Sequence, residues 1–424
     1  MLLNLSTIRS ISTVRNILLH CNLNSWWTRF PTPAALGQTH LVVGGKMALL
    51  TFMNQTIFDH GASAQLGKVL AQHGITKPLL CTDRGLVELG MVNNLAAAVG
   101  NDAAITVFDG TPENPTQMAV EEAIEKYHSA DCDGVVALGG GSSMDLAKAV
   151  ALGVTHDGDL IDYTAGMGGA AKIGTVAPLV AVPTTSGTGS EVSSGAVIIM
   201  NNGEKLILAS RELVPKTAIC DPTLTIGLPP RLTSATGMDA MTHCIEALLS
   251  PQINPPAEAV ACDGIERGIK EGHLLRAAQD GGDEDARWNM MMASTEGAMA
   301  FSKGLGAVHS MSHACGADQK LRLHHGTLNA VILPTILDFN RDHVGEKYTR
   351  LNEAMGISSG DDPADFIREL NTKLDLPKNL SAMGVANDAI PDLSEHAAKD
   401  VCTFTNPRPC TASEYESLYE VAIG

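Results

Sequence analysis

Four short, continuous apolar runs lie between Met47 and Pro230, with helical stretches between them. The runs span residues 78–83, 104–109, 134–138 and 179–182. Continuous apolar runs of this length are typical of strands that are buried on both faces of a parallel sheet. Residues 115–130 place an apolar stripe opposite charged side chains, as an amphipathic helix does. The alternation predicts a doubly wound α/β domain with a mostly parallel sheet over residues 47–230.

The pattern changes after Pro229-Pro230. Long segments with helical periodicity follow, and they are interrupted at Gly281-Gly282, Gly356 and Pro377. Ser413 and Glu416 have the spacing of a capping box, which predicts the start of the last helix. No second series of strand-like runs is evident, so we predict an all-α domain over residues 231–424. A chain of 424 residues is long enough for two domains.

Residues 1–46 differ from the rest of the chain. No Asp or Glu precedes Asp59, while Arg9, Arg15 and Arg29 lie among Ser, Thr, Leu and Asn. Such a leader resembles a mitochondrial transit peptide, which would predict the mitochondrial matrix. We favour a second interpretation, in which Met47 is the true start and the protein is cytoplasmic. The codons for residues 44–46 (Gly-Gly-Lys) would be GGN-GGN-AAR. Just before Met47, such codons resemble a bacterial ribosome-binding site that has been translated by mistake.

Charge and cysteine content restrict the class of partner. The net charge is −18, from 29 basic and 47 acidic residues, so nucleic acid and anionic membranes would be repelled. No apolar run reaches the roughly 18–20 residues that a membrane helix needs. The nine cysteines include no Cys-x-x-Cys pair, which favours a reducing compartment and excludes a paired-thiolate metal site. A small-molecule partner remains.

Four side chains from three stretches can converge on one cation: Asp239, His243, His309 and His325. The first two lie four residues apart in a helical run, which places a carboxylate and an imidazole on one helix face. His313 repeats this spacing after His309. Three imidazoles and one carboxylate suit a divalent transition metal better than calcium or magnesium.

Two glycine-bearing segments, residues 139–145 and 183–191, directly follow predicted strands. Backbone N–H groups in such turns can approach a pyrophosphate, and a helix N-terminus adds partial positive charge. Each could also be an ordinary turn or an exposed Ser/Thr loop. Asp83 closes an earlier strand, where an acid can bind ribose hydroxyls and favour NAD over NADP. An exposed aspartate at a strand end is the alternative.

These motifs resemble those of the iron-containing (group III) alcohol dehydrogenase family. The resemblance runs in order from about Met47 to the C-terminus and is carried by residues 139–145, 184–191, 237–243, 307–313 and 324–330. Within the family, residues 254–256, 303–306 and 405–408 are most similar to the 4-hydroxybutyrate dehydrogenases.

The resemblance implies a fold like that of dehydroquinate synthase, a homodimer, and a metal in the cleft between an NAD-binding domain and a helical domain. It implies Fe²⁺ bound by Asp239, His243, His309 and His325, although these ligands would also accept Zn²⁺. It implies cofactor contacts from Gly140, Gly141, Ser142, Asp145, Thr184, Thr185, Thr188 and Lys205. The stretch 314–323 lacks the usual Pro-His-Gly, which leaves His324 or His325 as the fourth ligand. We choose His325 because it directly precedes Gly326.

The predicted activity is metal-assisted hydride transfer between NAD and a primary alcohol or ω-hydroxy acid. The best candidate substrate is 4-hydroxybutyrate. His313 is the candidate catalytic residue, either supporting His309 or relaying a proton from the cleft. Lys303 could attract a substrate carboxylate or could be solvated. One alternative is a transhydrogenase that passes the hydride to a 2-oxo acid. Another is a lyase of the dehydroquinate-synthase type, which we rank low because few basic residues flank Asp239 and His243.

Overall fold

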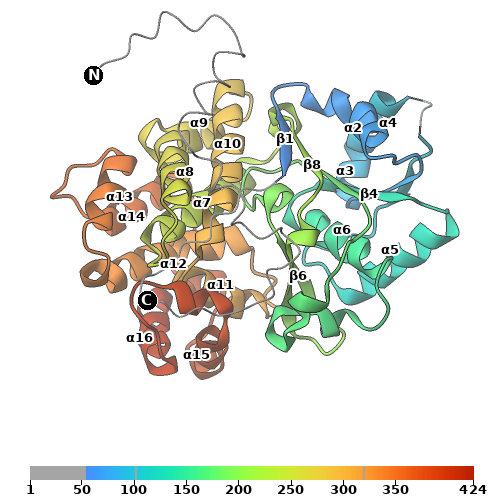
Figure 1. The fold of residues 1–424 in the computed structure, drawn as a ribbon. Helices are drawn as coiled ribbons and strands as arrows, with labels where there is room; N and C mark the ends of the chain where they lie inside the picture. Colours follow the sequence, from blue (N-terminus) through green and yellow to red (C-terminus); the bar gives the residue numbers. More distant parts are fainter. Residues whose placement is uncertain (1–53, 101–102, 319) are drawn as a thin grey trace, which may run out of the picture. The chain divides into compact units, whose positions relative to one another are not determined.

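A six-stranded parallel sheet forms the first half of the described chain (Figure 1). The computed structural model describes residues 54–424 except 101, 102 and 319, so the predicted leader lies outside the described residues. The strands are β1 (Gln55–Phe58), β2 (Pro78–Cys81), β3 (Thr106–Phe108), β4 (Gly134–Gly139), β5 (Leu179–Pro183) and β8 (Thr217–Cys220). Their order is β1-β8-β5-β4-β2-β3, and every neighbouring pair is parallel. The four predicted strands correspond to β2, β3, β4 and β5.

Helices cover both faces of this sheet, as a doubly wound fold requires (Figure 1). Val135 and Ala137 of β4 pack in the cluster that contains α5 (Gln117–Ser129) and α6 (Gly141–Gly153). Val136 and Leu138 pack instead with α2 (Leu66–Gln72) and α4 (Met91–Val99). Because successive strand residues point to opposite faces, a continuous apolar run satisfies both layers. The prediction of an α/β sheet region is confirmed.

One pair of strands departs from the prediction. Strands β6 (Gly195–Ile199) and β7 (Lys205–Ala209) form a separate antiparallel hairpin. Both strands carry apolar residues, in residues 195–199 and 206–209, but their buried and partly exposed residues are mixed because the hairpin lies outside the parallel sheet.

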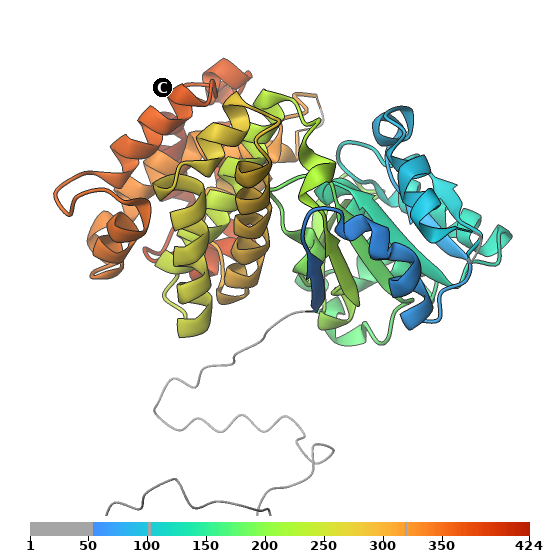
Figure 2. The ribbon, with the colours of Figure 1, turned by 90° about the horizontal axis from the view of Figure 1, so that it is seen from above.

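The described residues after β8 form only helices and turns, which confirms the helical second region (Figure 2). The α-helices are α7 (Pro230–Leu249), α8 (Pro255–Ile265), α9 (His273–Gln279), α10 (Glu284–Ala300), α11 (Ala307–Gly316), α12 (His325–Asn340), α13 (Lys347–Met355), α14 (Pro363–Lys373), α15 (Ile390–Lys399) and α16 (Ala412–Ile423). Helix α7 is buried on all sides from Thr233 to Leu249. Among residues 54–100, 103–318 and 320–424, no helix has the length and apolar character that crossing a bilayer requires. A domain boundary at residue 230 stays a prediction.

The start of the last helix corrects the sequence prediction. Thr411, not Ser413, is the N-cap residue of α16, and Glu414, not Glu416, completes the capping box. The Thr411 hydroxyl accepts a hydrogen bond from the Glu414 backbone N–H, and a Glu414 carboxylate oxygen accepts one from the Thr411 N–H. Both spacings fit the capping-box pattern, and the structure selects the earlier one.

The position of Lys303 contradicts both interpretations made from the sequence. Its side chain is not solvated, and it does not line the cavity in which a substrate carboxylate could bind. Its side chain is buried, and Nζ donates to the carbonyl oxygens of Ala247, Leu248 and Ser250. It also pairs with Glu258 at 3.2 Å. The ammonium group therefore satisfies carbonyls at the C-terminus of α7, where a positive charge is favourable.

We predict that Lys303→Met lowers the free energy of unfolding by roughly 3 kcal/mol, because buried carbonyl oxygens lose their donor. Lys270→Met is the matched control, since Lys270 forms an exposed i, i+4 pair with Glu266. It should cost less than about 0.5 kcal/mol. Urea unfolding followed by circular dichroism measures both, and equal losses would contradict the assignment.

Candidate metal centre and cofactor cavity

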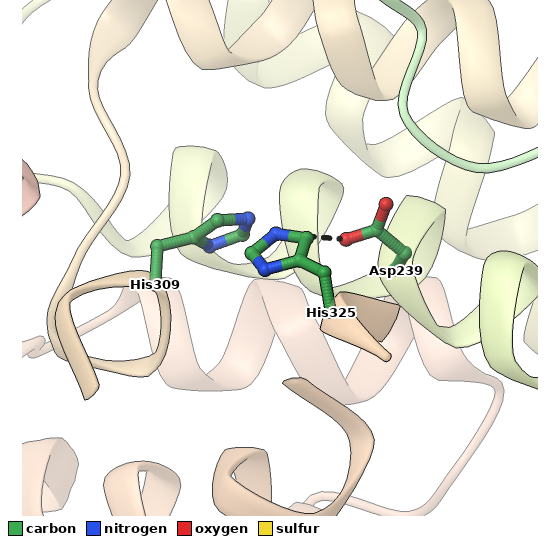
Figure 3. Close-up of side chains that lie close together, drawn as sticks. All are labelled: Asp239, His309 and His325. Atoms are coloured by element: carbon green, nitrogen blue, oxygen red, sulfur yellow. Dashed lines mark ion pairs between the residues drawn. The ribbon is translucent and has the colours of Figure 1, made fainter. Parts of the chain in front are cut away.

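Three helices bring a carboxylate and three imidazoles together. Helix α7 supplies Asp239 and His243, α11 supplies His309, and α12 begins with His325. Nε2 of His325 lies 3.6 Å and Nε2 of His243 lies 3.8 Å from Oδ1 of Asp239. One ligand atom each from Asp239, His309 and His325 lies within 4.8 Å of the other two (Figure 3). The rings of His243 and His309 stack with centroids 4.7 Å apart.

Burial keeps these imidazoles neutral. It lowers the pKa of His243 to about 4 and that of His309 to about 3. It also lowers the pKa of His325 well below the ordinary value. Neutral imidazole is the form that binds a metal, because its lone pair is free.

The outer nitrogens of two rings have hydrogen-bond partners. Nδ1 of His309 lies 2.5 Å from a carboxylate oxygen of Glu246, and Nδ1 of His325 lies 3.2 Å from Oγ of Ser312. Their Nε2 atoms face the cluster. The amide nitrogen of Asn329 donates to Oδ1 of Asp239 at 2.7 Å and lies within 3.3 Å of both Nε2 atoms. Acceptor atoms therefore converge on one point.

The charge balance of the cluster also fits a cation. Asp239 is 2% and Glu246 is 5% exposed. Among the described residues, neither carboxylate pairs with a Lys or Arg; their ion-pair partners are histidines with depressed pKa values. Since an uncompensated buried carboxylate is costly, the donor set and its charge fit a divalent metal ion.

His324 lies outside this cluster. It is the N-cap residue of α12, and its Nδ1 accepts a hydrogen bond from the backbone N–H of Thr327 at 3.4 Å. The geometry thus brings His325, the residue chosen from the sequence, next to Asp239.

A cavity of about 500 Å³ extends from this cluster to the end of the sheet. Its walls contain most of the residues singled out from the sequence: Asp83, Gly140, Gly141, Ser142, Asp145, Thr185, Thr188, Lys205, Asp239, His313, His324 and His325. His243 and His309 do not line it, and both are buried. Thr184 does not line it either; it is buried, and its backbone N–H donates to the Gly139 carbonyl oxygen.

The two glycine-bearing segments meet because β4 and β5 are neighbours in register, with Gly139 opposite Pro183. A Cβ atom on Gly140 would lie 3.3 Å from the Thr185 side chain, and one on Gly141 would lie 2.7 Å from that of Thr188. Glycine therefore permits the close approach of the two segments. Helix α6 begins at this point of the cavity wall, where its free N–H groups can bind an anion.

A buried lysine holds the second segment in place. Nζ of Lys148 donates to the hydroxyls of Ser190 and Ser193 and to the Gly195 carbonyl oxygen, at 2.7–3.0 Å. The Asp145 carboxylate accepts from the Ser190 hydroxyl and from the Val197 N–H. Asp145 thus lines the cavity while both of its oxygens bind the chain itself.

Asp83 and Lys205 lie on the cavity wall with protein partners of their own. Asp83 is the N-cap residue of α3 (Arg84–Glu88), and its side chain accepts from the Leu86 N–H. Nζ of Lys205 donates to Oδ1 of Asn114 at 3.1 Å. Lys205 is the only Lys or Arg among the described residues that line the cavity.

His313 stands in the cavity and contacts a residue that the sequence did not identify. Its Nδ1 lies 2.9 Å from Oδ2 of Asp400, and its ring stacks on that of His325 at 5.3 Å. Asn329 was also missed, although its position four residues after His325 was a usable signal. Asp400 had no such local signal.

We predict that His309→Ala abolishes metal retention and turnover but spares NAD binding, because His309 does not line the cavity. His324→Ala is the matched control and should retain the metal, since His324 caps α12 instead. Metal content by mass spectrometry and NAD affinity by fluorescence quenching test both variants. Equal metal content in His309→Ala and the parent would refute the assignment.

Two family models match the chain. The iron-containing alcohol dehydrogenase model matches residues 54–222, and the C-terminal model of the Fe-containing alcohol dehydrogenase family matches residues 233–423. The 4-hydroxybutyrate dehydrogenase of Cupriavidus necator is 48% identical over 385 residues, which cover 89% of this chain and 100% of that protein.

Solved structures share the fold. A crystal structure of 1,3-propanediol oxidoreductase is similar with a TM-score of 0.84 at 32% identity, covering 88% of this chain and 100% of that one. The sulfoacetaldehyde reductase of Bifidobacterium kashiwanohense, solved in complex with NAD⁺, has a TM-score of 0.82 at 26% identity, covering 90% and 100%.

Proposed function

We propose that this chain, which belongs to the iron-containing alcohol dehydrogenase family, oxidises the terminal alcohol of an ω-hydroxy acid with NAD as hydride acceptor. The best candidate reaction converts 4-hydroxybutyrate to succinate semialdehyde. The observation that carries the hydride-transfer proposal is the single cavity lined by both the glycine turn and the Asp239–His325 pair. The choice of substrate is supported by the 48% identity to a 4-hydroxybutyrate dehydrogenase.

In this proposal Asp239, His243, His309 and His325 hold Fe²⁺, or Zn²⁺ in its place. When bound, the ion lowers the pKa of a nearby hydroxyl group, and the nicotinamide accepts two electrons as hydride. The chain's own contribution is orientation and exclusion of water. Leu232, Val197 and Leu323 supply apolar surface to the cavity.

The cofactor would lie along the glycine turn. Gly140, Gly141 and Ser142 would bind its pyrophosphate at the start of α6, and Thr185 and Thr188 would contact it from the facing loop. Asp83, Asp145 and Lys205 are proposed as further contacts from the cavity wall, Asp83 to the ribose. Thr184, which does not line the cavity, would act only through its backbone.

His313 is proposed as the proton relay. Because the Asp400 carboxylate accepts the Nδ1–H of His313, Nε2 keeps its lone pair and can take up a proton from the substrate side. Because the hydrogen-bond partner of His313 is Asp400, the relay role is favoured over the alternative in which His313 supports His309.

We predict that Asp400→Asn lowers kcat roughly 10- to 100-fold with unchanged metal content, because the amide no longer favours the Nδ1–H tautomer. The Asn oxygen can still accept from the Cys402 N–H, so the local fold should persist. Asp392→Asn, an exposed change on α15, is the control. Steady-state kinetics on iron-loaded enzyme decide, and an unchanged kcat would remove Asp400 from the relay.

The substrate is tested by comparing 4-hydroxybutyrate with 1-butanol, which has the same carbon chain without the carboxylate. We expect kcat/KM at least tenfold higher for 4-hydroxybutyrate, followed as NADH absorbance on iron-loaded enzyme. Preference for butanol would contradict an ω-hydroxy acid substrate.

Oxidation of 4-hydroxybutyrate that requires an added 2-oxo acid and releases no NADH would favour the transhydrogenase alternative. The lyase alternative is disfavoured, because a phosphorylated substrate would want several cations. Lys205 is the single Lys or Arg on the described cavity wall.

A further inference from the structure

Two sequence motifs away from the cavity wall meet at the first turn of α11, the helix that carries His309 and His313. Oδ1 of Asn406 accepts a hydrogen bond from the backbone N–H of Ala307 at 3.1 Å. Gly306 leaves room for this contact, since a Cβ there would lie 2.7 Å from the Asn406 oxygen. Residues 303–306 and 405–408 therefore fix the start of the helix.

Glu246 extends from α7 to the same turn, where its carboxylate contacts both the backbone of α11 and the ring of His309. One carboxylate oxygen accepts from the backbone N–H of Val308 at 2.8 Å, and the other lies 2.5 Å from Nδ1 of His309. A Cβ on Gly306 would also lie 2.9 Å from this carboxylate, so glycine is needed on this side too. Burial raises the pKa of Glu246 to about 7, and the backbone N–H groups at the start of α11 oppose part of that rise.

Glu246 determines which nitrogen of His309 is available. A carboxylate that accepts from Nδ1–H leaves the Nε2 lone pair directed at Asp239 and His325, and it makes the imidazole a stronger donor to a cation. The Asn406 side chain hydrogen-bonds to the backbone of the helix, to the side chain of Asn340 and to the Arg408 carbonyl oxygen, so it can fix the helix without affecting the His309 ring.

We propose that Glu246 is a positioning residue of the metal centre, which sets the tautomer and the donor strength of His309. This inference rests on the proposed function, because it requires a divalent ion beside Asp239, His309 and His325. It assigns Asn406 a purely structural part, so the two residues at the same helix turn can be separated by experiment.

The test compares Glu246→Gln with Asn406→Ala in the full-length protein. Co²⁺ is titrated into metal-depleted protein in competition with a chromophoric chelator, and its visible spectrum and the thermal unfolding midpoint are recorded. Glu246→Gln should weaken Co²⁺ binding 10- to 100-fold and alter the Co²⁺ spectrum. Asn406→Ala should lower the unfolding midpoint but leave the spectrum and the Co²⁺ affinity within about threefold of the parent, since it spares the ring.

Equal Co²⁺ affinity in Glu246→Gln and the parent would overturn the inference, as would equal weakening in both variants. If Glu246→Gln does not fold, Glu246→Asp replaces it; a carboxylate one methylene shorter cannot reach both Val308 and His309, so the same loss is expected. A parent that binds no Co²⁺ would instead contradict the metal centre of the proposed function itself.

Discussion

Helix α7 must bury three ionisable side chains in the middle of the molecule. Asp239, His243 and Glu246 lie on one stripe of a helix that is enclosed on all sides, and none of them is more than 5% exposed. Burial of charge is costly unless a partner compensates it. The first turns of α11 and α12 bring His309 and His325 beside this stripe, but both imidazoles are neutral, so a bound cation would have to supply the compensating charge. The helical region is thus organised around the same residues that would bind the metal.

Two glycines allow the sheet region to pack closely against α7 and α10. A Cβ on Gly187 would lie 2.7 Å from the backbone oxygen of Thr236 in α7, and one on Gly189 would lie 2.2 Å from the Ala298 side chain in α10. The loop after β5 therefore packs directly on α7, the helix that carries Asp239 and His243. Since β4 and β5 end side by side, the same contact carries the α6 turn with it. This packing explains how the glycine turn and the carboxylate–imidazole cluster come to share one cavity.

Local patterns determined what the sequence could predict. The strands β2 to β5 and the i, i+4 pair Asp239–His243 depend on residues that are close in the chain, and periodicity detects them. The β6–β7 hairpin is also apolar in sequence, but its antiparallel pairing outside the main sheet was not predicted. Lys303, Asp400 and Glu246 take their roles from partners 53 to 87 residues away, and no spacing in the chain records such contacts.

The negative charge of the cavity would give a bound metal ion a second role, in attracting an anionic substrate. The described wall of the cavity contains four carboxylates, from Asp83, Glu113, Asp145 and Asp239, and one ammonium group, from Lys205. Of these, Glu113 is neutralised by Arg322 at 2.6 Å, and Asp145 lies close enough to Lys148 and Lys205 to interact with both. Among the described residues, Asp239 forms no ion pair with a Lys or Arg. Because a negative cavity repels a carboxylate substrate, a divalent ion at Asp239 would favour an ω-hydroxy acid electrostatically as well as acidify its hydroxyl group. Selectivity for an anionic substrate would then depend on the same buried stripe of α7 as the chemistry.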